Sequence, residues 1–438
     1  MTELQKAIAS LLDLIASSHP DTSRLMVPLV WEANCDPVDW LEAQPLFPKF
    51  YWRSRDEREE VLAIGQIRTF TSARSAETAL GEGQRIWGGS SFDGRTERAN
   101  RCLQSFFFLP RVEISRQDGR WTLAVNLCED RQRIISALQA LVENVKCKGE
   151  IQCNVLKKDY SPCYPEWENM VETALDAISD AQFEKVVLAR RTTVTLDQPI
   201  PPAQLLKTSK QRNARAFHFM FALDSKHCFV GSTPERLFAR QEGELATEAL
   251  AGTIGRGKSE QEDDTLADWL MNDAKNIYEN KLVVDDILSR LNPWCQDLYA
   301  DDTPHLVKLR HVQHLRRSIR ATLDHGISNS ALLENLQPTA AIAGLPRDKA
   351  IDFIHHHEPF ARGWYSGAVG YISDERSEFC VAIRSALILE NELHLFAGAG
   401  IVPGSQPQSE WKELDRKTAT LLNLIPQNDE LVAEQVAS

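Results

Sequence analysis

The 438-residue sequence is poor in positive charge. It has 49 Lys and Arg residues against 62 Asp and Glu residues, which gives a formal net charge of −13 at pH 7. Binding to nucleic acid depends on clustered Lys and Arg side chains that neutralise phosphates. The one basic cluster, from Arg310 to Arg320, is interleaved with aliphatic residues and is interpreted as a strand or helix with a solvated face. We therefore expect no nucleic-acid partner.

Long apolar runs and paired cysteines are also missing. The chain has no run of about eighteen apolar residues that could span a membrane, and its helix-like N-terminus lacks the basic leader of a signal peptide. The nine cysteines form no C-x-x-C pair. An odd number of cysteines scattered along a long chain is typical of free thiols in a reducing compartment. We expect a cytoplasmic protein with no membrane partner and no structural zinc.

Strand-like and helix-like segments fall into separate clusters along the chain. Short apolar runs broken by Gly, Pro and Asp predict strands from residue 20 to about 145 and again after residue 185. Helical periodicity predicts helices over 130–145, 166–182, 265–291 and 348–356. No internal repeat is evident. This grouping predicts an α+β fold with antiparallel sheets.

A glycine-rich run near the C-terminus is followed by charges at helical spacing. Small residues in Ala397–Val402 allow a backbone to approach a ligand closely. Pro407 suits the first turn of a helix on which Glu410, Glu413 and Lys417 share one face. Two interpretations fit this pattern. It could be half of a site for a metal and an anion, or Glu413 and Lys417 could form a surface ion pair worth roughly a few tenths of a kcal/mol.

Residues 252–259, GTIGRGKS, match the phosphate-loop pattern G-x-x-x-x-G-K-[ST]. That pattern binds nucleotides only between a buried strand and a helix whose N-terminal amides hold the phosphates. Here the preceding segment has the composition of a weak strand. Four carboxylates follow directly, at Glu260, Glu262, Asp263 and Asp264. We therefore expect no nucleotide site.

Separated segments between residues 150 and 425 together resemble the chorismate-utilising enzymes. In family order they are FEKVVLAR, GSTPERL, TEALAGT, the pair HL at His314, RGWYSGAVGY, AIRSA, GAGIV and SEWKELDRK. The block from Leu336 to Tyr371 is similar to the menaquinone-pathway isochorismate synthases of that family. The resemblance implies large antiparallel sheets that enclose the site with helices outside. It also implies a strand-rich region at 1–149 that joins the same fold, a catalytic core at 150–427 and a disordered tail at 428–438.

The resemblance implies an isomerase that adds water at carbon 2 of chorismate and expels the hydroxyl of carbon 4. This reaction requires a base for the water and an acid for the leaving oxygen. Lys185 corresponds to the base, although a lone lysine at the start of a strand is usually solvated. Glu235 corresponds to the acid, although an ion pair with Arg236 would also explain it. The acid must carry its proton at the working pH.

The resemblance also implies a magnesium site. Glu279 and Glu413 correspond to metal ligands, with Glu410 close by through bound water, and hard carboxylate oxygens suit Mg²⁺. Periodicity alone places Glu279 on the solvent side of its helix. Many relatives carry an acidic residue where this chain has Asn276. The residues expected to contact the substrate are Leu250, Gly252, Thr253, His314, Tyr365, Arg384, Gly398 and Lys417.

Relatives with this scaffold make anthranilate, aminodeoxychorismate or salicylate. The ammonia-using relatives work with a glutamine-hydrolysing partner, and they usually have a different residue where Leu250 stands. Because a leucine cannot position ammonia by a hydrogen bond, we expect no glutaminase subunit. The resemblance implies chorismate as the substrate. Salicylate synthases also carry leucine here, so a salicylate synthase and a siderophore-pathway isochorismate synthase stay as alternatives. We expect a monomer or a weak homodimer.

Overall fold

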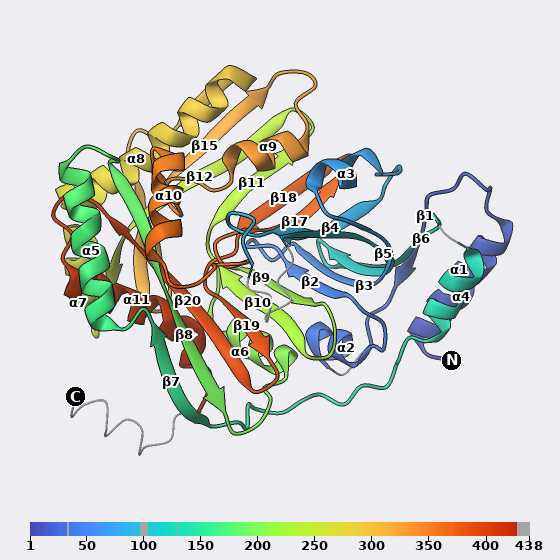
Figure 1. Ribbon diagram of the computed structural model, residues 1–438. Coiled ribbons are helices and arrows are strands. Elements are labelled where there is room, and N and C mark those ends of the chain that lie inside the picture. Colours follow the sequence, from blue (N-terminus) through green and yellow to red (C-terminus); the bar gives the residue numbers. More distant parts are fainter. Residues whose placement is uncertain (33–34, 97–103, 129, 427–438) are drawn as a thin grey trace.

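The computed structural model describes residues 1–32, 35–96, 104–128 and 130–426. Within them the chain forms an α+β fold on one continuous sheet in which every strand pairing is antiparallel (Figure 1). The expected fold class is confirmed. The expected tail at 428–438 lies outside the described residues, and the boundary at residues 149 and 150 stays a prediction. No described helix is both long enough and apolar enough to cross a membrane.

The first 140 residues are mainly strands. Their elements are α1 Glu3–Ser17, β1 Arg24–Leu29, α2 Pro37–Ala43, β2 Lys49–Arg53, β3 Glu59–Phe70, α3 Ala73–Thr78, β4 Arg85–Ser90, β5 Ser105–Gln117, β6 Arg120–Asn126 and α4 Arg131–Gln139. Helices α1 and α4 lie together at the right-hand end of the molecule (Figure 1). The helix expected over 130–145 is present but ends six residues early.

The rest of the chain alternates groups of strands with helices. Its first elements are β7 Val155–Ser161, α5 Tyr164–Ser179, β8 Lys185–Leu196, α6 Pro202–Arg212, β9 Phe217–Ala222, β10 His227–Thr233, β11 Arg236–Gln241, β12 Glu244–Gly255, α7 Glu260–Asn272 and α8 Ala274–Leu291. There follow β13 Cys295–Ala300, β14 His305–Lys308, β15 Val312–Leu323, α9 Asn329–Leu336, β16 Gly344–Leu345, α10 Arg347–His357, β17 Ala368–Ser373, β18 Arg376–Val381, β19 Ser385–Leu389, β20 Glu392–Ile401 and α11 Pro407–Leu422.

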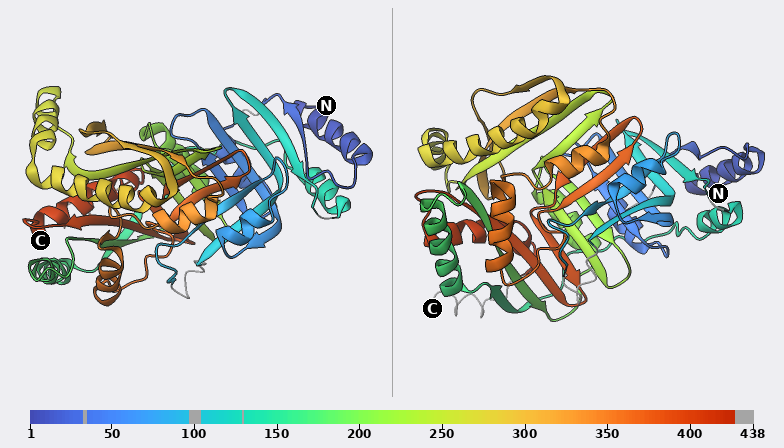
Figure 2. Two further views of the ribbon diagram at one scale, coloured as in Figure 1. Left: turned by 90° about the horizontal axis from the view of Figure 1, so that it is seen from above. Right: turned by 45° about the horizontal axis from the view of Figure 1, so that its top comes forward.

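The N-terminal strands connect two halves of the sheet. One half runs β15, β12, β11, β18 and β17, and β17 pairs with β4. The other half runs β8, β20, β19, β10 and β9, and β9 pairs with β2. Strands β4 and β2 are joined through β5 and β3. Helix α8 lies against β12 and β15, while α10 lies against β8 and α11 against β20 (Figure 2).

Strands β8 and β20 show how the sequence pattern decides which side chains face inward. Successive residues of a strand point to opposite faces. In β8, Val186 and Leu188 enter the hydrophobic core that also contains residues of α5 and α10, so Lys185 and Val187 lie on the other face. In β20, Ala399 and Ile401 join the same core, which leaves Gly400 on the inner face opposite β8. The small residues of the glycine-rich run Ala397–Val402 thus leave the inner face of β20 open.

The helix expected over 265–291 is two helices, which corrects the prediction. Helix α7 ends at Asn272, and the Asp273 side chain accepts a hydrogen bond from the Asn276 backbone N–H as the N-cap of α8. Aspartate is a favoured N-cap because its oxygen satisfies an otherwise unpaired amide. Apolar periodicity across this break mixes two helical phases, so it could not predict which side of α8 is buried.

Candidate active site

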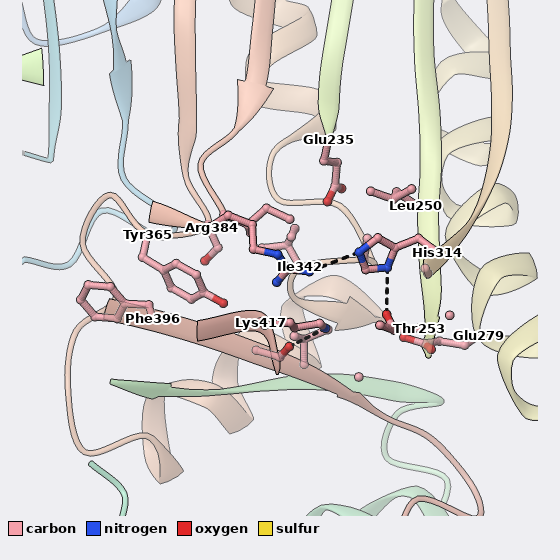
Figure 3. Close-up of a pocket in the computed structure, with 18 residues that line it drawn as sticks. Glu235, Leu250, Thr253, Glu279, His314, Ile342, Tyr365, Arg384, Phe396 and Lys417 are labelled. Atoms are coloured by element: carbon pink, nitrogen blue, oxygen red, sulfur yellow. Dashed lines mark hydrogen bonds between the residues drawn. The ribbon is translucent and has the colours of Figure 1, made fainter. Parts of the chain in front are cut away.

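A pocket opens between the β8–β20 side of the sheet and the β12–α8 side (Figure 3). All eight residues expected to contact the substrate line it, together with Glu235 and Glu279. The full set of lining residues is Val187, Glu235, Leu250, Ala251, Gly252, Thr253, Glu279, His314, Ala341, Ile342, Tyr365, Ser366, Ile383, Arg384, Phe396, Gly398, Gly400 and Lys417. Lys185 and Glu413 are not in the lining but form ion pairs with the lining residues Glu279 and Lys417. Glu410 pairs with Lys275, which is also outside the lining.

Lys185 is fully buried at the start of β8. Its ammonium lies 3.0 Å from the Glu279 Oε1 and makes no hydrogen bond in the described part of the chain. Burial disfavours ionisation of Glu279, but the positive charges of Lys185, Lys417 and Lys275 outweigh it and lower the pKa of this carboxyl. Lys185 is therefore not the solvated lysine that its position in the sequence would ordinarily suggest.

The Glu235 carboxyl is buried at the turn between β10 and β11 and points into the pocket (Figure 3). Its backbone N–H donates to the Thr233 hydroxyl at 3.3 Å, and its C=O accepts from the Val381 amide at 3.1 Å. Burial raises the pKa of this carboxyl to about 8, and the nearby Glu248 carboxylate adds to the rise. Lys185, among the surrounding cations, opposes it. Near neutral pH the group can donate a proton, as an acid catalyst requires.

His314 links two sides of the pocket through its ring nitrogens (Figure 3). An Arg384 guanidinium N–H donates to Nε2 at 3.2 Å, and Nδ1 lies 3.0 Å from the Thr253 Oγ1. A guanidinium is only a donor, so Nε2 accepts and the ring proton is on Nδ1, facing the threonine oxygen. Burial, together with the charges of Arg384 and Lys417, holds the pKa of His314 well below its usual range. The ring is thus a neutral connector.

Arg384 and Tyr365 supply polar groups on the opposite wall. Arg384 is buried between β18 and β19 with a left-handed backbone, φ 48°, and burial lowers its pKa to about 10. The ring of Tyr365 stacks on Phe396 with centroids 5.1 Å apart and planes 14° apart. Burial raises the pKa of Tyr365 to about 12, so its phenol keeps its proton. Together they offer a cation and a hydroxyl donor, which suit a carboxylate.

Lys417 reaches the pocket from α11. Its ammonium donates to the Gly398 C=O at 2.8 Å and lies 2.6 Å from the Glu413 Oε1. Among the described residues, β19 pairs with β20 only from Glu392 to Leu395, so this edge of β20 has no strand partner after Leu395. The Gly398 carbonyl lies on that open edge and is used by the lysine. The two side chains of the ion pair are only 14% and 18% exposed, so the pair belongs to the pocket rather than to the surface.

Three lysines pair with the three carboxylates expected to hold a metal. Glu279 pairs with Lys185, and the Lys275 ammonium lies 2.6 Å from the Glu410 Oε1, while the third pair is Glu413 with Lys417. Among the described residues, no three or more His, Cys, Asp or Glu side chains converge as a ready metal site. Burial and the charges of Glu413 and Glu279 nevertheless raise the pKa of Glu410. Carboxylate oxygens that repel one another through their charges, as Glu410 does with Glu413 and Glu279, are chemically suited to a hard divalent cation.

Two asparagines fix the orientation of α8. The Asn276 Oδ1 accepts from the Thr253 amide at 3.0 Å, and the Asn280 side chain donates to the Ala251 and Leu315 carbonyls at 3.1 Å each. Both asparagines are buried against β12 and β15. The interpretation of this side of α8 as solvent-facing is therefore wrong, because polar side chains are buried here by bonding strand carbonyls and amides. Glu279 is held at the pocket by this attachment.

Several pocket residues were not identified from the sequence. Ala341 and Ile342 precede β16, Ser366 follows Tyr365, and Ile383 precedes Arg384 in the chain. Each lies in or beside a segment that carries the family resemblance, so the motif itself was the available signal. Their apolar or small side chains give no chemical signal of their own. Phe396 was missed for the same reason.

The phosphate-loop match lies at the end of β12 and the start of α7. Contrary to the sequence reading, the preceding segment is a long, largely buried strand. The Gly257 N–H donates to the Asp263 Oδ1 at 3.0 Å, and the Lys258 N–H donates to the Glu262 Oε2 at 2.7 Å. These amides are thus already bonded to carboxylates of the following helix. This arrangement supports the expectation that the motif is a chance match.

Comparisons with known proteins agree over almost the whole chain. A family model described as chorismate binding enzyme matches residues 13–426. The chain is 38% identical to isochorismate synthase MenF of Escherichia coli (strain K12), over 97% of this chain and 99% of that protein. A solved structure of the menaquinone-specific isochorismate synthase MenF from Escherichia coli matches with a TM-score of 0.89 and covers 97% of this chain. Anthranilate synthase component I from Streptococcus pneumoniae matches in fold alone, with a TM-score of 0.65 at 18% identity.

Proposed function

The chain belongs to the chorismate-binding enzyme family, and we infer from its pocket that it is an isochorismate synthase, an isomerase that converts chorismate to isochorismate. One observation carries the inference beyond family membership. The pocket places a carboxyl with a pKa of about 8 in the electrostatic reach of the buried Lys185. A protonated acid and an amine in one small site are what the addition of water and the loss of a hydroxyl require.

Acid and base act on opposite oxygens in this proposal. Lys185 Nζ, as the base, accepts a proton from water as the water oxygen bonds to ring carbon 2. The ring double bonds shift, the bond from carbon 4 to its hydroxyl breaks, and Glu235 donates its proton to that oxygen, so a second water leaves. Each group serves the reverse reaction in the opposite role. Atoms and charges balance without an oxidant, a reductant or a nucleotide.

Substrate carboxylates find complementary groups on two walls. Arg384 and Tyr365 suit the enolpyruvyl carboxylate, because a guanidinium can hold a carboxylate by two hydrogen bonds and the phenol adds a third donor. His314 of β15 bonds both Arg384 and Thr253 of β12, and these side chains would face the ring. Lys417 offers a compact positive charge beside Gly398. The aliphatic Leu250 leaves water positioning to Lys185.

Glu279 and Glu413 would hold Mg²⁺, with Glu410 alongside. The support is the chemistry of the donor set, three buried or half-buried carboxylates that act on one another through their charges. When bound, such a cation neutralises and orients the ring carboxylate. Without the cation, the three lysines form ion pairs with these carboxylates.

Menaquinone biosynthesis is the proposed use of the product, because similarity to the Escherichia coli menaquinone-specific enzyme extends over 97% of this chain. A salicylate synthase would use the same pocket and then eliminate pyruvate. The two are separated by incubating the purified protein with chorismate and Mg²⁺ and resolving the products by chromatography. Salicylate and pyruvate are identified by mass, and isochorismate, an isomer of chorismate, is identified by its separate retention and its absorption spectrum. Isochorismate without salicylate or pyruvate is expected. Unchanged chorismate would refute the proposed activity, and salicylate would replace it with the alternative.

A further inference from the structure

An ion pair outside the pocket connects the N-terminal region to the turn that carries Glu235. Arg55, between β2 and β3, donates to both carboxylate oxygens of Glu248 in β12, at 2.5 and 2.9 Å. The same guanidinium donates to the Pro234 C=O at 2.6 Å. Glu248 also accepts from the Arg236 backbone N–H at 2.9 Å. The pair thus bonds the residues immediately before and after Glu235.

This pair is enclosed. The Glu248 side chain is 4% exposed and that of Arg55 is 16% exposed. Arg316 is the other cation within ion-pair distance of Glu248, at 4.0 Å, among the described residues. Glu248 and Leu250 are two residues apart in β12 and so point to the same side of the strand, and Leu250 lines the pocket. A buried charge so close to a reacting group acts through a medium that screens poorly.

The electrostatic surroundings of Glu235 come from several elements. Burial and the Glu248 carboxylate raise its pKa, and three cations lower it. The groups that face it or act on it are Glu248 of β12, Lys185 of β8, Lys417 of α11, Arg384 before β19, Tyr365 before β17 and Cys380 of β18. Glu248 is the carboxylate among them, and the Arg55 guanidinium opposes its charge through their ion pair. The two members of the pair therefore act on the pKa of Glu235 in opposite directions: Glu248 raises it, and Arg55 opposes Glu248.

We propose that Arg55 and Glu248 are positioning residues that hold the Glu235 turn in place and keep the Glu235 carboxyl protonated to the degree that proton donation needs. The proposal rests on the function proposed above, in which Glu235 is the proton donor. The proposal predicts the direction in which each substitution changes the pKa of Glu235. Removing the negative charge of Glu248 should make Glu235 more acidic, whereas removing the positive charge of Arg55 should expose Glu248 and make Glu235 less acidic.

The test is a pH titration of Glu235 itself. The infrared carbonyl band of its protonated carboxyl, identified by its absence in E235Q, is followed with pH in the parent and in three variants. In E248Q, which keeps the shape of the side chain, the midpoint should fall by about one pH unit. In R55M it should rise by a similar amount. In R55K, which retains the charge, it should stay near the parent value.

The double variant R55M/E248Q decides whether the effect passes through Glu248. With Glu248 already neutral, R55M should add little, and the midpoint should stay near that of E248Q. The fully buried Glu113, which accepts from Arg24 and Arg85, gives a matched control. E113Q removes a paired carboxylate elsewhere and should leave the Glu235 midpoint unchanged. The melting temperature of E113Q shows whether a loss of stability by itself can change the Glu235 midpoint.

Two results would overturn the proposal. Unchanged midpoints in both E248Q and R55M, in folded protein, would leave the pair a structural link only. Shifts of the same sign would show that general loosening of the turn governs Glu235. The pH profile of kcat gives the functional readout, and its apparent pKa should move with the infrared midpoint. The midpoints could shift in the predicted opposite directions in E248Q and R55M while the parent protein fails to convert chorismate. That result would refute the proposed activity and leave the pair's control of Glu235 intact.

Discussion

Adding one methyl group at Gly400 should displace the Glu279 carboxylate. A Cβ on Gly400 would lie 2.2 Å from the Glu279 Oε1 and 3.0 Å from the Lys185 Cε. Ordinary contact begins at 3.4 Å, so the carboxylate oxygen must move by at least 1.2 Å, the difference between 3.4 and 2.2 Å. Gly400 has no left-handed backbone, so alanine fits the strand itself.

The expected cost of Gly400→Ala is therefore in catalysis rather than in folding. Overpacking costs about 1–3 kcal/mol when the surroundings cannot move, but here the obstacle is the end of a side chain on α8. A displacement of about 1 Å in a positioned group can lower turnover by about 100-fold. We expect a loss of this size in kcat, together with a higher Mg²⁺ concentration at half-maximal activity and a melting temperature within a few degrees of the parent.

The measurements are isochorismate formation at saturating chorismate, a Mg²⁺ titration of the rate, and thermal unfolding. Gly243→Ala is the control, because a Cβ there meets no atom within 4 Å and the residue has no left-handed backbone. It should behave as the parent in all three assays. If Gly400→Ala kept the parent kcat and Mg²⁺ dependence, the position of Glu279 in the pocket would not matter for the reaction.

Three further predictions concern single side chains. Lys185→Ala and Glu235→Gln should each lower kcat by two or more orders of magnitude, roughly 3 kcal/mol, with little change in substrate affinity; near-normal turnover in either would show a misassigned role. Glu279→Gln and Glu413→Gln should weaken Mg²⁺ binding in a titration and recover part of the activity at high Mg²⁺; a variant with the parent's metal dependence would not be a ligand. Leu250→Thr should yield some aminated product, detected by mass, when ammonium is supplied at high pH; only hydroxylated product from an active variant would place nucleophile selection elsewhere.

Most of the fold could be predicted from the sequence, because strand and helix periods are local properties. The α+β class and the helix at 348–356 follow from such patterns, and the structure confirms both, with α10 at Arg347–His357. The break at Asp273 was not predicted, since an aspartate inside an otherwise helical pattern is a weak signal beside continuous apolar periodicity. The strand at residues 244–255 was underestimated, because the small residues of ATEALA have low strand propensity and the strand is stabilised by pairing with β15.

The site could be predicted mainly through the resemblance of its motifs. Lone residues such as Lys185 and Glu279 give the same local signal whether they are solvated or buried. What buries them is distant in the sequence: Asn276 and Asn280 attach α8 to strand carbonyls and amides, and Lys185 meets a carboxylate 94 positions away. Single-sequence periodicity carries no information about such contacts. The Arg55–Glu248 pair, 193 positions apart, was missed for the same reason.

The two sequence interpretations of Glu413 and Lys417 turn out not to exclude each other. The i,i+4 ion pair forms, at 2.6 Å, yet both side chains are mostly buried and Lys417 lines the pocket. An ion pair on an exposed helix contributes little because water screens it and its side chains lose freedom. In the pocket, the same pair keeps a lysine and a carboxylate in fixed places before any ligand arrives. Fixed charge of this kind is useful to an enzyme because less reorganisation remains to be done during the reaction. Spacing along the helix could predict the pair, whereas its use depends on the glycine-rich strand on which Lys417 rests.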